Sequence, residues 1–518
     1  MKKILLINLR RFGDIFYSGQ VLKGLAEKYP KAEISILTYQ ESSRAARAFA
    51  QFQNIFTVDR EKLGILLKGG PFSFAHSFKE LKNSLESVGF EWDLIVNLSN
   101  CTVSAYLTSY LSQLENNYKG VRYNANGFLE FSDDWITWAN EIMVDLSVTP
   151  FSYMEVFTKS LELNTHPKTP VEFVCREGHE VSTQNIFSRL HTFRDSDQIH
   201  TVALQLTAST PEKSASLQES KELIQQIFSH QNLYPILLVG PSKEDRIFAQ
   251  ALNEAFENSL FSIEADFIGL NSILKSIDIL ITVDTSVKHL AALHQTKLLE
   301  LYFNQELLFK MPATSGSHLV LVDRNKVGTA FTTSAQFIAN CCWDVLQDHD
   351  ISSKTPAGTS IFNFDPGHGF SLIDTRERDV KELYGNYVYQ RACVAFALEM
   401  KFQTTLSVFS KELLSEYREI LSTILAAYRE MNASGPISAK KIFSAINNLE
   451  PSNYGTSPFQ VLLGVRKTQA MSKFCDDVEA NRKVFKEFLL TTKDEFLNLK
   501  QSIVNNLEST QRQRHHEI

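Results

Sequence analysis

The sequence lacks several features that would place it in a specialised class of protein. No apolar stretch is long enough to cross a bilayer, so we expect no transmembrane helix. The net charge of −7 shows no basic excess, which argues against general nucleic-acid binding. The composition, 43% hydrophobic and 21% charged, is that of a folded chain. Because 518 residues exceed what one core organises, we expect two or three domains.

Cysteine is scarce, and its spacing fits neither a metal site nor a disulfide framework. The six cysteines form no Cys-x-x-Cys pair and no Cys/His ligand pattern, and vicinal cysteines such as Cys341 and Cys342 rarely bond each other. We therefore expect reduced, mostly buried thiols in a cytoplasmic protein. The aliphatic run near the start has only four residues, which is too short for the core of a signal peptide.

The chain opens with a pattern of strand, turn and helix. Residues 3–8 are mostly aliphatic, Leu-Arg-Arg-Phe-Gly-Asp follows at 9–14, and apolar residues then recur at helical spacing from Ile15. We expect Gly13 to permit a sharp turn and Asp14 to lie at the carboxyl end of the strand, where open α/β sheets bind ligands. The alternative is that Asp14 only caps the helix.

Strands and helices alternate through the first two thirds of the chain. Strands are expected at residues 32–37, 55–58, 92–98, 201–206, 235–240, 277–283 and 297–303, and helices between them, for example around 78–88. This alternation predicts parallel, doubly wound sheets. A polar, proline-containing stretch at 164–170 separates two Rossmann-like halves, which would form a cleft between their rows of strand ends.

The character of the sequence changes from about residue 348. A loop-rich piece containing Asp-Pro-Gly-His-Gly at 365–369 precedes long segments with apolar residues three and four apart. These segments predict amphipathic helices, arranged as a small bundle or as an arm on the second Rossmann-like half. The composition of residues 365–369 favours a plain turn, with a metal or phosphate loop as the alternative.

The sharpest local signal lies at residues 281–290, Ile-Thr-Val-Asp-Thr-Ser-Val-Lys-His-Leu. A buried strand would place Asp284 at its carboxyl end, and Thr285 and Ser286 would then open a helix. The free N–H groups and the dipole of such a helix start both favour phosphate. A capped helix without a ligand is the alternative. His289, one turn inside the helix, is either a site residue or a structural hydrogen-bonding group.

With both motifs in view, the sequence resembles glycosyltransferase family 9, the ADP-heptose heptosyltransferases of lipopolysaccharide core synthesis. Members of that family open with a strand and a Gly-Asp turn, and they carry Asp-Thr-Gly-x-x-His-Leu in the second half. The resemblance covers about residues 1–345 and extends to Lys213, in the loop after residues 201–206, and to Glu244, just beyond a glycine. Ser286 departs from the family's glycine, and the family's Gly-Pro-Thr turn is absent near Tyr302.

The resemblance implies an α/β fold with two Rossmann-like domains facing across a cleft, the GT-B arrangement. Residues 1–165 would bind the acceptor, residues 171–345 would bind the nucleotide sugar, and residues 346–518 would add an α-helical region of unknown role. The resemblance also implies two catalytic residues. Asp14 would be the general base that takes the proton of the acceptor hydroxyl, and Lys213 would neutralise the diphosphate leaving group.

Other residues would bind substrate according to the same resemblance. Glu244 would hydrogen-bond the ribose, Asp284 would hold sugar hydroxyls, and the amides near residues 285–287 would hold phosphate. The predicted substrate-binding residues are Gly13, Ser209, Thr210, Glu244, Asp284, Thr285, Ser286, Val287 and His289. The donor would be a nucleotide sugar, ADP-heptose by resemblance, with no cofactor and no metal. Arg10 and Arg11 would meet an anionic acceptor or would simply be solvated.

The sequence thus predicts an inverting, metal-independent glycosyltransferase that transfers heptose to a lipopolysaccharide-core or related glycan acceptor. Its partners would be a nucleotide sugar and a glycolipid or oligosaccharide, with no nucleic acid. It would work in the cytoplasm or at the cytoplasmic face of the inner membrane. A second hypothesis is an inactive nucleotide-sugar-binding or scaffolding protein, motivated by Ser286 and the missing turn. A nucleotide-sugar epimerase of the same two-domain shape is a third.

Overall fold

The computed structural model divides the chain into two compact units, each built from two segments. The first unit is Met1–Leu94 with Glu162–Lys381, and the second is Ile95–Leu161 with Glu382–Ile518. This division differs from the expected domain boundaries, because residues 95–161 belong to the unit that contains the C-terminal helices. The structure describes the chain apart from residues 63–78, 80–81, 84, 114, 143–148, 176–198, 304–317, 324–332, 352–353, 366, 400–405, 407–408, 433–437, 450–456 and 517–518.

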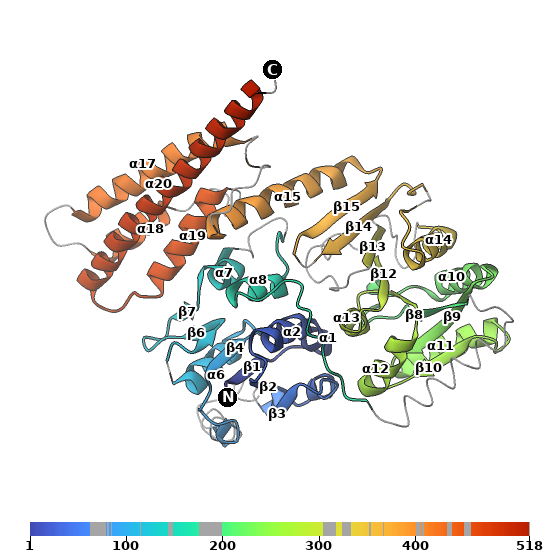
Figure 1. The fold of residues 1–518 in the computed structure, drawn as a ribbon. Coiled ribbons are helices and arrows are strands. Elements are labelled where there is room, and N and C mark those ends of the chain that lie inside the picture. Colours follow the sequence, from blue (N-terminus) through green and yellow to red (C-terminus); the bar gives the residue numbers. More distant parts are fainter. Residues whose placement is uncertain are drawn as a thin grey trace. The chain divides into compact units, whose positions relative to one another are not determined.

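The first unit begins with three parallel strands in the order β3-β2-β1 (Figure 1). They are β1 (Lys3–Asn8), β2 (Glu33–Tyr39) and β3 (Phe52–Val58). In β1, five consecutive side chains from Ile4 to Asn8 are buried, as expected for a parallel strand covered on both faces. The predicted helix around residues 78–88 falls partly outside the described residues, and residues 79, 82–83 and 85–86 within it are helical.

The helix after β1 begins earlier than its apolar pattern indicated. It is divided into α1 (Phe12–Tyr17) and α2 (Gly19–Lys28), so Gly13 and Asp14 lie inside the first turn of α1. Gly13 has no positive φ, and the predicted sharp turn at this glycine is therefore wrong. A Cβ at this position would lie 3.6 Å from the Cα of Ser286, which is an ordinary van der Waals contact.

The second sheet of the first unit has eight strands in the order β10-β9-β8-β11-β12-β13-β14-β15. The first six are β8 (His200–Gln205), β9 (Leu233–Val239), β10 (Phe261–Glu264), β11 (Ile279–Thr282), β12 (Lys297–Tyr302) and β13 (His318–Asp323), all parallel. Its helices are α10 (Leu217–Ser229), α11 (Lys243–Ala255), α12 (Phe267–Ser276), α13 (Ser286–Leu293) and α14 (Ala335–Leu346). Aliphatic side chains of the central strands, α10 and α14 form one continuous core. The predicted alternation of strand and helix is confirmed here.

Two antiparallel strands follow where the sequence suggested only a loop-rich piece. They are β14 (Thr359–Asp365) and β15 (Gly369–Thr375), which extend the second sheet beyond β13 (Figure 1). Ile361, Phe362 and Phe364 are buried in β14 and supply the apolar face. Residues 359–365 and 369–375 are therefore strands, which corrects the expectation of a loop-rich piece before the C-terminal helices.

The second unit combines short elements of the first half with the C-terminal helices. Its elements are α6 (Thr102–Ser112), β5 (Tyr118–Lys119), β6 (Val121–Tyr123), β7 (Leu129–Phe131), α7 (Asp134–Thr137) and α8 (Tyr153–Ser160), then α17 (Ser410–Asn432), α18 (Ala439–Asn447), α19 (Pro458–Met471) and α20 (Val478–His516). β4 (Leu94–Asn97) and α15 (Arg378–Glu399) contain the points at which the chain passes between the units. α17 and α20 run side by side (Figure 1).

Half-buried arginines join the two segments of the second unit. Arg391 of α15 donates to Glu155 Oε1 at 2.8 Å and to the carbonyl oxygen of Pro150 at 2.7 Å. Arg466 of α19 binds Asp134 at 2.6 Å and Glu495 at 2.8 Å. These ion pairs are largely withdrawn from water, where removing one partner is costly. The C-terminal helices thus share a unit with residues 95–161, which differs from the expected arm on the second half.

Among the described residues, no helix combines the length and the apolar character that crossing a bilayer requires.

Candidate active site

The first unit contains a cavity of about 1480 Å³ at the ends of strands from both of its sheets. Its lining includes all of the residues singled out from the sequence: Gly13, Asp14, Ser209, Thr210, Lys213, Glu244, Asp284, Thr285, Ser286, Val287 and His289. These residues come from four segments spread over more than half of the chain. The structure therefore brings the predicted set together in one place, although their individual roles remain predictions.

Asp14 both caps a helix and lines the cavity. The backbone N–H of Arg11 donates to Asp14 Oδ2 at 3.2 Å, so the capping alternative is also realised. Burial raises the pKa of Asp14 above its ordinary value, and the nearby charges of Arg10 and Arg11 only partly oppose this effect. A half-buried carboxylate with a raised pKa is a better proton acceptor than one in water.

Asp284 lies between two lysines. Lys213 Nζ is 2.7 Å from Asp284 Oδ2, and Lys288 Nζ is 2.9 Å from Asp284 Oδ1. Burial alone would raise the pKa of Asp284, but the charges and hydrogen bonds of Lys288 and Lys213 lower it to about 2. This carboxylate therefore remains ionised at any physiological pH, and it fixes the position of the Lys213 ammonium group at the cavity.

Lys288 belongs to a buried polar cluster that the sequence analysis missed. Its side chain is fully buried, lies 3.3 Å from Glu300 Oε2, and donates a hydrogen bond to the hydroxyl of Tyr302. Glu300 and Tyr302 are two residues apart on β12 and so point to the same face. The sequence offered one indication of this cluster: Glu300 lies in the middle of an apolar strand, and a buried carboxylate needs a partner.

The loops after β8 and β9 are joined by Asp245, the residue after the predicted ribose-binding Glu244. Asp245 Oδ1 accepts from Thr207 Oγ1 at 2.7 Å, and its Oδ2 accepts from Ser242 Oγ at 2.7 Å. Gly240 makes this possible, because a Cβ at that position would lie 2.2 Å from Asp245 Oδ2. Glu244 is exposed and lines the cavity beside this linkage, where its carboxylate is accessible to a ligand.

The start of α13 reaches the cavity as predicted. Thr285 is the residue preceding the first helical turn, and Asp284, Thr285 and Ser286 are half-buried in the lining. His289 is 4% exposed and packs against Tyr17 with 4.8 Å between ring centroids. It therefore has a packing role in addition to lining the cavity, so both interpretations of this histidine remain open.

Four arginines line the same cavity: Arg10 and Arg11 before α1, and Arg44 and Arg47 in and after α3 (Ser43–Ala46). Arg11, Arg44 and Arg47 are exposed. The sequence analysis considered the first pair and missed the second. The second pair could have been found from its spacing, because two arginines three residues apart in helical backbone lie on one face. Together they make one side of the cavity attractive to anions.

Comparison with known proteins connects this cavity to a family. Residues 79–334 match the model of "Glycosyltransferase family 9 (heptosyltransferase)". A search of curated proteins finds no match. The matched range includes the Lys213, Glu244 and Asp284 positions and begins after Asp14, so the first motif rests on the sequence resemblance and the cavity alone.

Solved structures resemble the fold at low sequence identity. The glycosyl transferase family 9 structure from Veillonella parvula is 13% identical with a TM-score of 0.50, covering 67% of this chain and 97% of the other. The ADP-heptose lipopolysaccharide heptosyltransferase II of E. coli is 17% identical, with a TM-score of 0.45 and coverage of 67% and 99%. The E. coli heptosyltransferase WaaC with ADP is 15% identical, with a TM-score of 0.45 and the same coverage.

These similarities agree with a mixed α/β fold with parallel sheets, and the family match covers the segments that form the second sheet up to β13. The resemblance drawn from the two motifs is confirmed, because residues 79–334 match the glycosyltransferase family 9 model.

Proposed function

We propose that this protein is an inverting, metal-independent glycosyltransferase that uses the cavity of the first unit. The observation that carries the proposal is the convergence of Asp14, Lys213 and Asp284 from separate segments onto one cavity. A proton acceptor, a cation and a helix start are the groups that sugar transfer from a nucleotide diphosphate requires.

Asp14 is the general base of the proposed reaction. Its carboxylate takes the proton of the acceptor hydroxyl while that oxygen attacks the anomeric carbon from the side opposite the leaving group. The bond between the anomeric carbon and the diphosphate oxygen breaks at the same time, so the configuration inverts. The raised pKa of Asp14 favours this proton transfer, since it brings the base closer to the operating pH.

Lys213 and the start of α13 stabilise the departing diphosphate. Asp284 already pairs with Lys288 as well as with Lys213, so it keeps one ammonium partner when Lys213 turns to phosphate. The backbone N–H groups near residues 285–287 add further donors. Positive charge is thus available without a divalent ion. Glu244, exposed at the rim, is placed to bind ribose hydroxyls.

The donor of the proposed reaction is ADP-heptose, and the acceptor is an anionic glycan such as a lipopolysaccharide core. Support for the donor comes from the family description, which names heptosyltransferases. Support for an anionic acceptor comes from the four arginines on the cavity wall, because guanidinium groups bind phosphate in a bidentate manner. The proposed place of action is the cytoplasm or the cytoplasmic face of the inner membrane.

Calorimetric titration of ADP and of ADP-heptose into the wild type and Lys213→Ala tests the donor site. We expect both ligands to bind and Lys213→Ala to weaken binding more than about tenfold, roughly 1.4 kcal/mol. Lys221→Ala in α10, outside the cavity, is the matched control and should bind as the wild type does. Equal affinities for wild type and Lys213→Ala would contradict the assigned role of this lysine.

Product analysis separates the competing functions. Transfer to an added acceptor supports the proposed reaction. Donor binding without transfer to any acceptor would favour an inactive nucleotide-sugar-binding protein. Ser286 and the missing Gly-Pro-Thr turn are the features that motivate this alternative. Conversion of the donor sugar without an acceptor would indicate an epimerase.

A further inference from the structure

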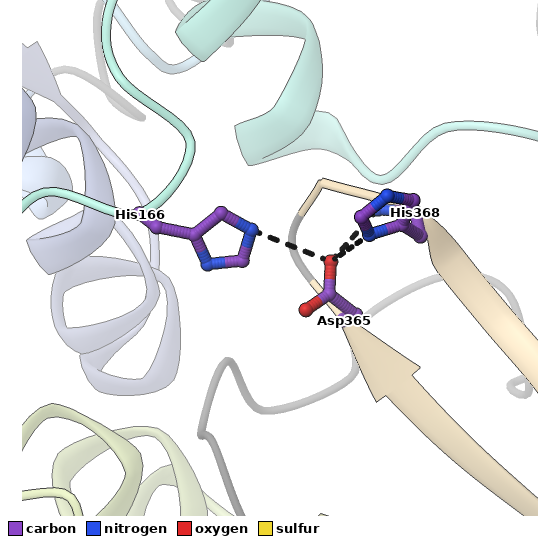
Figure 2. Close-up of side chains that lie close together, drawn as sticks. All are labelled: His166, Asp365 and His368. Atoms are coloured by element: carbon purple, nitrogen blue, oxygen red, sulfur yellow. Dashed lines mark hydrogen bonds and ion pairs between the residues drawn. The ribbon is translucent and has the colours of Figure 1, made fainter.

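The turn between β14 and β15 and the segment around residues 164–170 bring three possible metal ligands together (Figure 2). Asp365 Oδ1 lies 2.9 Å from His368 Nδ1 and 3.5 Å from His166 Nε2. All three ligand atoms lie within 4.8 Å of one another. About two hundred residues separate His166 from the other two, so the fold, not sequence proximity, creates this group, which we call the His166 triad.

The backbone on both sides of the triad is held in place. Asp365 Oδ1 accepts from the N–H groups of Gly367 at 2.8 Å and His368 at 2.9 Å, which fixes the carboxylate against its turn. On the other side, Glu27 of α2 accepts from Asn164 at 2.9 Å and from the backbone of Lys168 at 2.5 Å. Both supports lie within the first unit, so the two histidines are presented from anchored segments.

A glycine leaves the space in which the triad meets. A Cβ at Gly367 would lie 2.9 Å from His166 Nε2, 3.2 Å from Asp365 Oδ1 and 3.4 Å from Thr165 Oγ1. A side chain at position 367 would displace the tip of the His166 imidazole, which is 54% exposed and can move. Glycine at this position therefore lets His166 lie against the turn that holds Asp365 and His368.

We propose that the His166 triad binds a divalent transition-metal ion, with Zn²⁺ as the best match to its ligands. Two imidazole nitrogens and one carboxylate oxygen are a donor set that zinc accepts, with a fourth position left for water. Tetrahedral Zn²⁺ with bonds of about 2.1 Å needs ligand atoms about 3.4 Å apart, which small side-chain rotations provide here.

The ion serves structure rather than sugar transfer. It ties the 164–170 segment, which is anchored on α2, to the hairpin that ends the second sheet. A bound ion therefore opposes separation of these two parts of the first unit, and its free energy of binding adds to the free energy of unfolding. The side chains of His166 and His368 are 54% and 84% exposed, so an ion reaches them without rearrangement.

Titration of Zn²⁺ into the full-length protein, freed of any affinity tag, tests the triad without reference to activity. We expect one equivalent to bind at micromolar concentration or tighter, and His166→Gln and His368→Gln each to weaken binding roughly tenfold or more. Asp365→Asn, which keeps the turn's hydrogen-bond acceptor, should also weaken it. Co²⁺ should give the visible spectrum of a tetrahedral site in the wild type but not in the three triad variants.

Two controls address the other histidines. His349→Gln alters an exposed histidine outside the triad, and a His515→Gln/His516→Gln double variant removes the vicinal pair near the end of α20. Both should bind Zn²⁺ as the wild type does. Zn²⁺ should also raise the melting temperature of the wild type and these controls but not of His166→Gln. Equal binding in all variants, loss of binding in a control, or no saturable binding by the wild type would overturn the proposal.

Discussion

Two aspartates of the cavity follow parallel strands in similar positions but have opposite electrostatic surroundings. Asp14 lies in the first turn of α1, and Asp284 lies two residues before the start of α13. Burial raises the pKa of Asp14, and the nearby charges of Arg10 and Arg11 only partly oppose this rise. Burial also disfavours the charged form of Asp284, yet Lys288 and Lys213 contact it directly and lower its pKa to about 2.

The comparison shows that direct ion pairing, rather than burial, separates the two carboxylates. A carboxylate whose pKa is raised by burial takes up a proton more readily, whereas one held between two ammonium groups stays ionised. The first arrangement suits a base and the second suits a fixed charge that positions a lysine. Breaking either arrangement should therefore affect different properties of the protein.

The largest expected effect comes from removing the base. Asp14→Asn keeps a capping side chain but cannot accept the proton, so we expect the transfer rate to fall about 10²–10⁴-fold while ADP affinity stays within about twofold. Steady-state kinetics with calorimetry measures both. Asp348→Asn, at an exposed carboxylate outside the cavity, is the control. In the wild type, the transfer rate should fall as the pH drops through the raised pKa of Asp14. Transfer by Asp14→Asn at the wild-type rate would exclude Asp14 as the general base.

A large effect on stability is expected from Lys288→Met. This change leaves Glu300 buried without its cationic partner, so the free energy of unfolding should fall by about 3–5 kcal/mol. Adding Glu300→Gln should restore part of that loss, because the two residues interact directly. Urea denaturation measures the free energy of unfolding of the two single variants and the double variant, with Lys221→Met as a control outside the cluster. If Lys288→Met lowers the free energy of unfolding no more than Lys221→Met does, the buried Lys288–Glu300 pair does not stabilise the fold as expected.

A smaller effect should appear in acid. Because the folded-state pKa of Asp284 is lowered, its ion pairs contribute stability above the ordinary value near 3.8, and this contribution is lost as the pH falls towards 2. The shift corresponds to about 2 kcal/mol. Asp284→Asn should thus be less stable than the wild type at neutral pH, with the difference shrinking between about pH 4 and pH 2. A difference that is constant with pH would contradict the assignment of the shift to this carboxylate.

Much of the first unit could be predicted from its sequence because its signals are local. Aliphatic strands followed by helical spacing placed β1, β8, β9, β11 and β12 within a few residues. The helix start at α13 was also predictable, since a strand followed by Asp-Thr-Ser has few alternatives. The meeting of Asp14 with Lys213 and Asp284 followed from topology, because parallel strands present their carboxyl ends at one edge.

What the sequence did not predict depends on contacts between distant residues. The Lys288–Glu300 pair joins a helix to a strand, and the Asp245 linkage joins two loops, so neither has a local pattern. The turn predicted at Gly13 was wrong because a glycine in the first turn of a helix looks the same in sequence as a glycine in a sharp turn. The hairpin of β14 and β15 was missed because its short alternation resembles irregular structure.

The interleaved segments of the two units have a consequence for protein synthesis. The chain emerges from the ribosome with its N-terminal end first, so residues 95–161 appear long before Arg391 and Arg466, which supply their ion-pair partners. The second sheet of the first unit is likewise incomplete until the hairpin of β14 and β15 has been synthesised. A fragment cut at residue 345 would lack β14, β15 and every C-terminal helix, and would expose apolar surface that native folding covers. Attempts to express the family 9 region alone should therefore meet aggregation.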